Sequence, residues 1–264
     1  MKHPHAFDPP EPATPFVERR RVRDVSAGRA LATRERDRPE PSHYPLAPYV
    51  NARAAIHHDL VALALPFSDQ AEEFRSLRTE LVQSALVSQR PGALAVVSQD
   101  EGDGKSYIAA NLAVSFSELG GAVLVIDADL RRPSQHELLQ MPMGPGLAEV
   151  LCGQVPESDA VQAVAGIAGL HLLAAGRSAH DPLQLLQGPR MRLLLEDALA
   201  RFDHVIVDTP ANAGGPDARV LAVQAGRVLV VGRSGHTRVA PLRKLLEQLG
   251  RSPAAIAGVV LNDR

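Results

Sequence analysis

The chain has 264 residues, of which 45% are hydrophobic, 3% aromatic and 22% charged, and its formal net charge is −2. Near-neutral charge and scarce aromatic side chains exclude a bulk electrostatic nucleic-acid binder and a base-stacking platform, so no nucleic-acid partner is expected. The single cysteine, Cys152, excludes an intramolecular disulfide framework and a cysteine-based zinc site.

The N-terminal residues differ in composition from the rest of the chain. Residues 1 to about 50 hold nine of the 21 prolines, nine basic and seven acidic residues, and their apolar residues follow no helical or strand period. This composition predicts a disordered Pro/Arg-rich tail over residues 1–60, followed by one domain over 61–264. The basic run at 19–23 is either a solvated tail segment or a contact for anionic lipid or an acidic partner.

From Asp69 onward, helical and strand patterns alternate. Phe74, Leu77, Leu81 and Ala85 recur at helical spacing, and Pro91 stops that run. Further helices are predicted at 106–119, 190–201, 218–225 and 241–250, and strands at 93–97, 123–126, 170–173, 205–207, 228–231 and 257–261. The strands are apolar throughout, which is typical of a mostly parallel sheet flanked by helices in a three-layer α/β fold.

No apolar run reaches the about 18 residues that a membrane-spanning helix needs. The nearest, residues 161–176, is broken by Gln162, by two glycines and by His171. No apolar segment resembling a secretory signal follows Met1. These observations predict a cytoplasmic protein, with any membrane attachment supplied by a partner or a surface patch.

The strongest motif is the segment 102–106, which directly follows the first core strand and opens a helix. Gly102 and Gly104 let backbone N–H groups approach phosphate oxygens, and the following helix N-terminus adds partial positive charge. Lys105, one of only three lysines, is placed to reach the β and γ phosphates, and Ser106 to bind Mg²⁺. The segment therefore predicts a P-loop, the phosphate-binding loop of nucleotide-binding enzymes.

The motif departs from the full pattern G-x-x-x-x-G-K-[ST] because Gln99 stands at its first glycine position. An ordinary glycine turn between a strand and a helix is the alternative interpretation. Asp100, Glu101 and Asp103 make the loop acidic, which is unfavourable beside a triphosphate unless these carboxylates point away or act through Mg²⁺.

Two further carboxylate signals follow buried strands. Asp127 and Asp129 lie just beyond the strand at 123–126, and Asp208 ends the strand at 205–207. In an open α/β sheet, ligands bind at this edge. Carboxylates there can accept the proton of an attacking hydroxyl or hold Mg²⁺. The alternative for each aspartate is a turn or capping residue.

Together these segments resemble a known family. The phosphate loop at 102–106 is followed by 127–133, by 207–210 and by 258–262, in the order found in the cytoplasmic domain of bacterial tyrosine kinases. These enzymes control capsule and exopolysaccharide chain length. The helix at 72–79 is similar to the E-x-x-R-x-x-R oligomerisation helix of the family, and the resemblance runs from about Asp69 to Arg264.

The resemblance implies ATP and Mg²⁺ as cofactors and assigns roles to individual residues. Asp127 would be the base or a metal-linked carboxylate, Asp129 its partner, and Asp208 the carboxylate on the Mg²⁺ side. The residues implied for catalysis are Lys105, Asp127, Asp129 and Asp208; for the nucleotide, Gly102, Asp103, Gly104, Lys105, Ser106, Tyr107 and Asn262; and for Mg²⁺, Ser106, Asp127 and Asp208. The Min and Par partition ATPases share the fold but carry an early loop lysine where this chain has Asp100, which argues against that branch.

The resemblance also implies partners. Glu72, Arg75 and Arg78 would form a homo-oligomer contact, the alternative being an ordinary amphipathic helix with solvated charges. A separate membrane-bound chain-length protein would act as activator and bring the protein to the inner membrane. No metal beyond Mg²⁺ is expected, since His57 and His58 show no metal spacing and are predicted to be surface residues.

Three functions remain open: a protein-tyrosine kinase of the autokinase type, a P-loop ATPase acting as an assembly switch, and a non-enzymatic scaffold. Family members usually end in a tyrosine-rich tail, whereas the tyrosines of this sequence are Tyr44, Tyr49 and Tyr107. Autophosphorylation on a C-terminal cluster is therefore not expected. Tyr44 and Tyr49 are either internal acceptors or unmodified tail residues.

Overall fold

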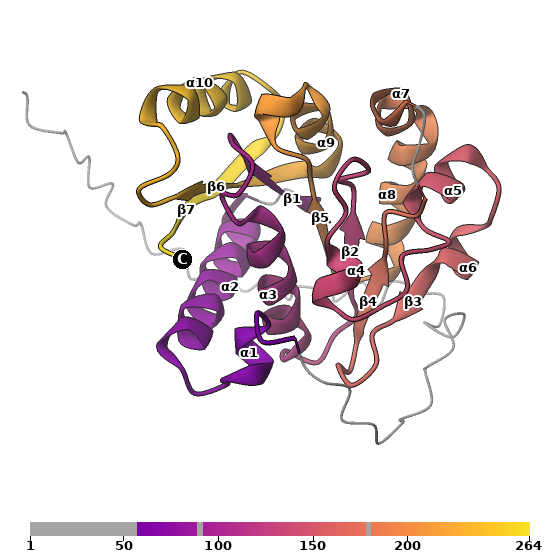
Figure 1. Ribbon diagram of the computed structural model, residues 1–264, viewed down its shortest axis with the longest axis horizontal. Coiled ribbons are helices and arrows are strands. Elements are labelled where there is room, and N and C mark those ends of the chain that lie inside the picture. Colours follow the sequence, from indigo (N-terminus) through magenta and orange to yellow (C-terminus); the bar gives the residue numbers. More distant parts are fainter. Residues whose placement is uncertain (1–56, 89–91, 178–180) are drawn as a thin grey trace, which may run out of the picture. The chain divides into compact units, whose positions relative to one another are not determined.

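The computed structural model describes residues 57–88, 92–177 and 181–264 (Figure 1). The predicted tail with its basic run, and the acceptor candidates Tyr44 and Tyr49, lie outside the described residues. The domain start expected at residue 61 stays a prediction. In the structure, Leu60 is already buried together with Val61 and Ala62.

One seven-stranded sheet forms the centre of the domain. Its strands are β1 (Ala93–Ser98), β2 (Val123–Asp127), β3 (Val161–Ala163), β4 (Leu170–Leu173), β5 (His204–Asp208), β6 (Gly226–Arg233) and β7 (Ala255–Asn262). The spatial order is β3-β4-β2-β5-β1-β6-β7, and every neighbouring pair is parallel except β3 with β4. The mostly parallel sheet and its six expected strands are thus confirmed, with β3 added as an antiparallel edge.

Helices cover both faces of this sheet. They are α1 (Val61–Ala64), α2 (Asp69–Ser88), α3 (Lys105–Ser117), α4 (Gln135–Leu138), α5 (Leu147–Cys152), α6 (Glu157–Ala160), α7 (Pro182–Gln187), α8 (Pro189–Arg201), α9 (Asp217–Ala225) and α10 (Val239–Gly250), with a 3-10 turn, η1, at Asn212–Gly214. Figure 1 shows α1, α2 and α3 gathered at the lower left and α7, α9 and α10 along the top.

Two apolar cores, one on each face of the sheet, explain the uninterrupted apolar runs. Along β1, Ala95 and Val97 belong to one core, while Leu94 and Val96 belong to the other. The first core is closed mainly by α5 and α7–α10, and the second by α1–α3. Because successive strand residues point to opposite faces, a strand covered on both sides must be apolar at every position.

The sheet register brings the predicted carboxylates together. Asp127 at the end of β2 pairs in register with Asp208 at the end of β5, and Val96 of β1 pairs with the same Asp208. Since these strands are parallel, their carboxyl ends and the loop that follows β1 share one edge. This edge carries the candidate site.

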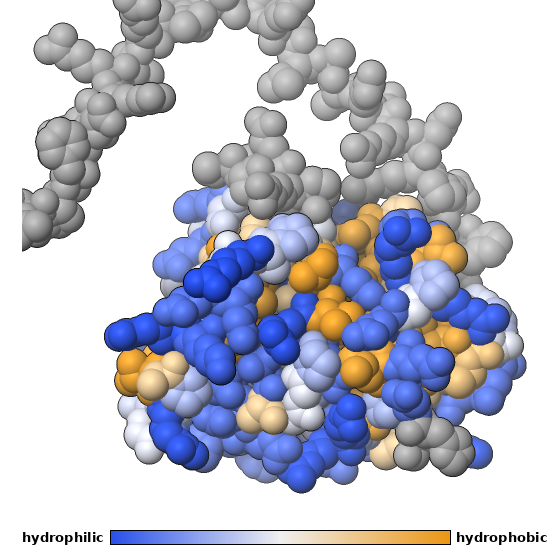
Figure 2. Space-filling view, turned by 90° about the horizontal axis from the view of Figure 1, so that it is seen from above, coloured by the Kyte–Doolittle hydropathy of each residue, from blue (hydrophilic) through white to orange (hydrophobic). Residues whose placement is uncertain are grey.

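Among the described residues, no helix is both long and apolar enough to cross a bilayer. The face seen in Figure 2 is mostly hydrophilic, with several separate groups of hydrophobic residues between. Large apolar side chains that stay exposed include Phe67, before α2, and Val259 and Leu261 on the edge strand β7.

Candidate active site

The phosphate loop connects β1 to α3 and has the backbone that its glycines predict. Gly102 and Gly104 adopt positive φ angles of 81° and 91°, a conformation that residues with a Cβ rarely adopt. Gly104 is also the residue that precedes α3, and a Cβ on it would clash with the Asn262 side chain. Both glycines are thus required by the loop itself, and the loop delivers the chain to a helix N-terminus.

The acidic residues of this loop are neutralised or turned inward. Glu101 forms an ion pair with Arg132. The Asp103 side chain is buried, where its Oδ2 accepts a hydrogen bond from the Asp100 N–H (2.9 Å) and its Oδ1 accepts one from the Thr237 hydroxyl (2.6 Å). The Glu101 charge is thus paired with a cation, and the Asp103 carboxylate is held by donors of the protein.

Lys105 and Ser106 are the first two residues of α3. The Lys105 ammonium group lies 3.7 Å from Oδ2 of Asp129, and both side chains are about nine-tenths buried. The structure therefore brings the predicted phosphate-binding lysine to the predicted carboxylates, although the two come from different strand-to-helix connections.

Asp127 and Asp208 form a buried carboxylate pair at the centre of the site. Burial and the neighbouring Asp208 carboxylate raise the pKa of Asp127 to about 8. The backbone N–H groups of Gln135 and Ser134 oppose this shift because they stabilise the ionised carboxylate. Burial also raises the pKa of Asp208, although the charge of Lys105 and hydrogen bonds from Gln135 and Ser106 oppose this. A cation placed between these two carboxylates would stabilise their ionised forms, which burial and mutual repulsion disfavour.

Gln135, the first residue of α4, connects both carboxylates and was not expected from the sequence. Its backbone N–H donates to Oδ2 of Asp127 (3.0 Å), and its side-chain Nε2 donates to Oδ2 of Asp208 (2.8 Å) and to the carbonyl of Ser106 (3.0 Å). Gln135 Oε1 and Asp208 Oδ1 are buried and have no hydrogen-bond partner in the structure. A glutamine eight residues after an aspartate gives no sequence signal, because a four-residue helix places it.

Asp129 shapes the turn that follows β2. Its Oδ1 accepts the backbone N–H groups of Arg131 (3.3 Å) and Arg132 (3.0 Å), which leaves Oδ2 toward Lys105. The Arg131 side chain in turn pairs with the buried Asp217 at the start of α9 (3.0 Å). The turn is therefore fixed at both ends before any ligand binds.

Two residues implied for the nucleotide make contacts within the protein. Asn262 is buried at the end of β7, and its Nδ2 donates to the carbonyl of Asp103 (3.1 Å). The ring of Tyr107 packs edge-on against Phe74 of α2, and the Arg264 guanidinium lies 4.7 Å from its centre. Asn262 thus supports the phosphate loop, while the Tyr107 ring faces α2; direct contact of either with a nucleotide stays a prediction.

The two arginines of the expected oligomer motif are engaged inside this chain. Arg75 donates to both carboxylate oxygens of Glu118 (3.0 Å each), to Glu72 (2.6 Å) and to the carbonyl of Pro66. Arg78 donates to Glu118 (3.2 Å) and to the carbonyl of Ser115 (2.6 Å). The motif therefore fastens α2 to the end of α3.

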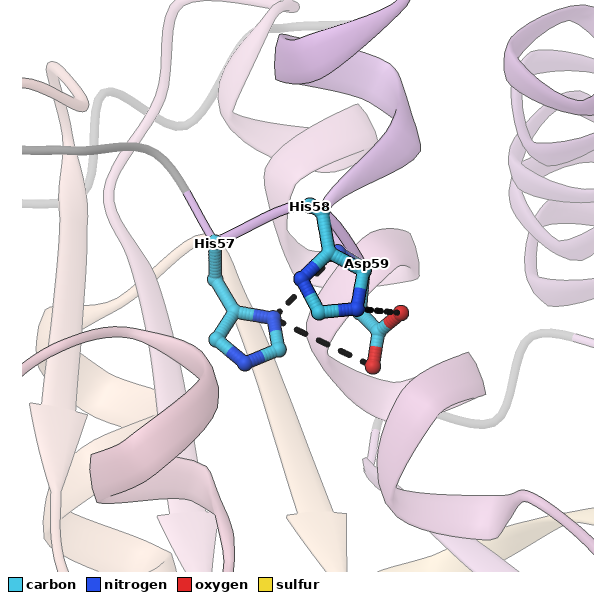
Figure 3. Close-up of side chains that lie close together, drawn as sticks. All are labelled: His57, His58 and Asp59. Carbon is cyan, nitrogen blue, oxygen red and sulfur yellow. Dashed lines mark hydrogen bonds and ion pairs between the residues drawn. The ribbon is translucent and has the colours of Figure 1, made fainter.

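A histidine pair near α1 lies close to a carboxylate (Figure 3). The rings of His57 and His58 stack 4.6 Å apart, and their nitrogens and the Asp59 carboxylate lie within 4.8 Å of one another. His57 Nδ1 already accepts the Asp59 N–H (3.2 Å), and Asp59 also pairs with Arg264. These contacts anchor the start of the described chain to its last residue.

Comparison with known proteins places the chain in a family. Residues 94–263 match the CobQ/CobB/MinD/ParA nucleotide-binding domain. The tyrosine-protein kinase YwqD of Bacillus subtilis is 34% identical over 215 residues, which cover 81% of this chain and 90% of YwqD. The chain belongs to the bacterial tyrosine kinase family.

Other relatives agree with this assignment. EpsB of Ralstonia nicotianae is 34% identical over 203 residues, covering 77% of this chain and 27% of EpsB, so the chain spans about a quarter of that relative's length. The solved kinase domain of the Escherichia coli tyrosine kinase ETK is 31% identical with a TM-score of 0.73, over 77% of this chain and 79% of that domain. The family, the P-loop nucleotide-binding domain and the predicted fold class are thereby confirmed.

Proposed function

We propose that this domain binds ATP with Mg²⁺ and transfers the γ-phosphoryl group to protein tyrosines in an exopolysaccharide or capsule system. The observation that supports this most directly is the convergence of Lys105, Asp129, Asp127 and Asp208 at one edge of the sheet, beside the phosphate loop. The kinase names of the relatives point to the same chemistry.

The described residues fit a nucleoside polyphosphate. The positive φ angles of Gly102 and Gly104 bring the loop backbone close to the space in front of the α3 N-terminus, and neither residue has a Cβ that would block a ligand there. Because α3 has 13 residues, its N-terminus carries the partial positive charge of a full helix. Lys105 would move from Asp129 to the phosphates when they bind.

The donor set also fits Mg²⁺. This ion prefers oxygen ligands and retains several of its waters. The Ser106 hydroxyl and the Asp208 carboxylate, with its unpartnered buried Oδ1, would hold it, with Asp127 beside them. When bound, Mg²⁺ would withdraw charge from the phosphate oxygens and stabilise the ionised carboxylates.

The remaining chemistry falls to the carboxylates. In the transfer, the tyrosine oxygen bonds to the γ-phosphorus, the bond to the bridging oxygen breaks, and ADP leaves. The hydroxyl proton passes to Asp127, or to its partner Asp129, which is slightly more exposed. Lys105 would neutralise the phosphate charge that develops.

One observation favours the ATPase switch as the second candidate. Tyr107 is the one tyrosine among the described residues, and its ring is held between Phe74 and Arg264. A kinase reaction would therefore need an acceptor tyrosine outside the described residues. ATP hydrolysis without phosphorylation needs no such acceptor.

Incubation with γ-labelled ATP, Mg²⁺ and a tyrosine-containing peptide polymer separates the candidates. Label on tyrosine supports the kinase, whereas phosphate release without label on protein supports the switch. Failure to bind ATP refutes both. Lys105→Met is the control that should abolish phosphate transfer and hydrolysis alike, and Lys244→Met, a lysine of α10 outside the site, should change neither.

We also propose a homo-oligomer formed through Glu72, Arg75 and Arg78, and an activating contact with a separate membrane-bound chain-length protein that holds the domain at the inner membrane. Glu72 is the more exposed partner of Arg75, so it is the motif residue most available to a neighbouring subunit. Light scattering tests the oligomer, because Arg75→Ala with Arg78→Ala should yield a smaller particle than the wild type. Co-purification with a candidate membrane protein tests the second contact.

A further inference from the structure

The loop between β6 and α10, residues 234–238, lies against the outer side of the phosphate loop. Arg233, the last residue of β6, donates from Nη1 to the carbonyl of Gly102 (3.1 Å), and His236 Nε2 lies 3.1 Å from the carbonyl of Glu101. Asn262, at the end of the neighbouring β7, holds the carbonyl of Asp103. The carbonyl groups of three successive phosphate-loop residues, 101–103, are thus each contacted by a side chain from β6, the β6–α10 loop or β7.

Thr237, which is half-buried, connects this loop to the buried Asp103. Its hydroxyl accepts the backbone N–H of Arg233 (2.6 Å) and donates to Oδ1 of Asp103 (2.6 Å), whose other oxygen takes the Asp100 N–H. The Asp103 side chain is 1% exposed, so a lost donor could not be replaced by bulk water. Thr237 therefore fixes both the β6–α10 loop and the centre of the phosphate loop.

The direction of the loop's donors follows from these contacts. In a trans peptide the carbonyl of one residue and the N–H of the next point in opposite directions. Carbonyl groups of Glu101, Gly102 and Asp103 that are held toward the β6–α10 loop and Asn262 therefore turn the following N–H groups away from them. Those N–H groups are the donors that a phosphate group would use.

We propose that Thr237 is a positioning residue for nucleotide binding, which acts through Asp103 to hold the phosphate loop with its N–H groups directed at the phosphates of a nucleoside polyphosphate. The inference rests on the proposed function of the same site. Thr237 is not itself one of the predicted nucleotide-binding residues, but it contacts one of them, Asp103, and no sequence pattern points to it. It also keeps the Asp103 carboxylate turned away from the phosphates.

The test compares Thr237→Val, which keeps the side-chain shape and removes the hydroxyl, with Thr237→Ser, which keeps the hydroxyl. Ser234→Ala, an exposed position of the same loop, is the matched control. Calorimetry measures the dissociation constant for Mg·ADP, and hydrogen exchange measures protection of the amides at 102–105. We expect the valine variant to bind about tenfold more weakly and to exchange faster, with the serine and alanine variants within about twofold of the wild type.

Equal Mg·ADP affinity in the valine variant and the wild type would overturn the proposal, as would a serine variant as weak as the valine variant. A melting temperature of the ligand-free valine variant near that of the wild type separates positioning from general unfolding. Should the wild type bind no nucleotide, the proposed function fails. Exchange of the Asp100 amide, which donates to Asp103 without any ligand, then decides alone: faster exchange in the valine variant supports the positioning of Asp103 by Thr237, and unchanged exchange refutes it.

Discussion

Replacing Asp127 by asparagine should make the ligand-free protein more stable at alkaline pH. The folded protein keeps the Asp127 proton up to a pKa of about 8, against an ordinary value of 3.8. Between these values the folded state holds one proton more than the unfolded state, so the free energy of unfolding falls as pH rises. Asparagine is uncharged, and its variant should lack this slope.

The structure sets the size of this effect. Roughly four pKa units correspond to at most about 6 kcal/mol, at about 1.4 kcal/mol per unit. Asparagine can still accept the N–H groups of Ser134 and Gln135 through its amide oxygen, but its NH₂ group then replaces the oxygen that accepts the Asp129 N–H. We therefore expect a gain of about 2 kcal/mol near pH 9, shrinking to zero or below near pH 4.

Urea unfolding without nucleotide or metal, followed at several values from about pH 4 to about pH 9, measures this difference. Asp197→Asn makes the same chemical change at an exposed position of α8 and should leave the pH dependence of the wild type intact. Parallel stability curves for the wild type and the Asp127 variant would refute the reasoning, because they would show that the buried pair does not retain an extra proton.

The remaining predictions concern stability at neutral pH, measured by urea unfolding. Gln135→Leu removes the amide donor to the buried Asp208 and should cost about 1–3 kcal/mol; an unchanged midpoint would show that the carboxylate has another partner. Glu118→Gln weakens the half-exposed network with Arg75 and should cost about 1 kcal/mol or less, with the loss shrinking at high salt; a salt-independent loss would contradict an ionic origin. Leu112→Ala opens a cavity in a fully buried part of α3 and should cost about 2–5 kcal/mol, so a cost below 1 kcal/mol would indicate a loosely packed core.

Local sequence patterns were sufficient to predict the strands and the long helices of the fold. Each predicted strand except the edge strand β7 is an apolar run because both faces of the sheet are covered, and each long helix repeats its apolar residues over several turns. The segments α4 to α7 have only four to six residues, so a period of 3.6 cannot repeat within them. β3 has only three residues and is antiparallel to β4, so its short sequence pattern did not predict it either.

The residues of the candidate site differ in the same way in how far the sequence predicts them. The proximity of Lys105, Asp127 and Asp208 could be predicted because each lies at or beyond the end of a buried strand, and parallel strands bring their ends together. The contacts of Gln135 and Thr237 could not, because each is a side-chain contact with a residue distant in sequence. The residues proposed to bind follow the strand pattern, whereas the contacts around them depend on how loops pack.

The ion pair between Asp59 and Arg264 has a consequence for handling the domain. It places the start of the described chain beside its last residue, whose guanidinium group lies over the Tyr107 ring. A tag or fusion partner joined directly before His57 or after Arg264 would therefore emerge from the same spot on the surface. A short linker from Arg264 to His57, in place of residues 1–56, would allow a circular permutant with new ends opened in an exposed loop elsewhere and the sheet left uncut.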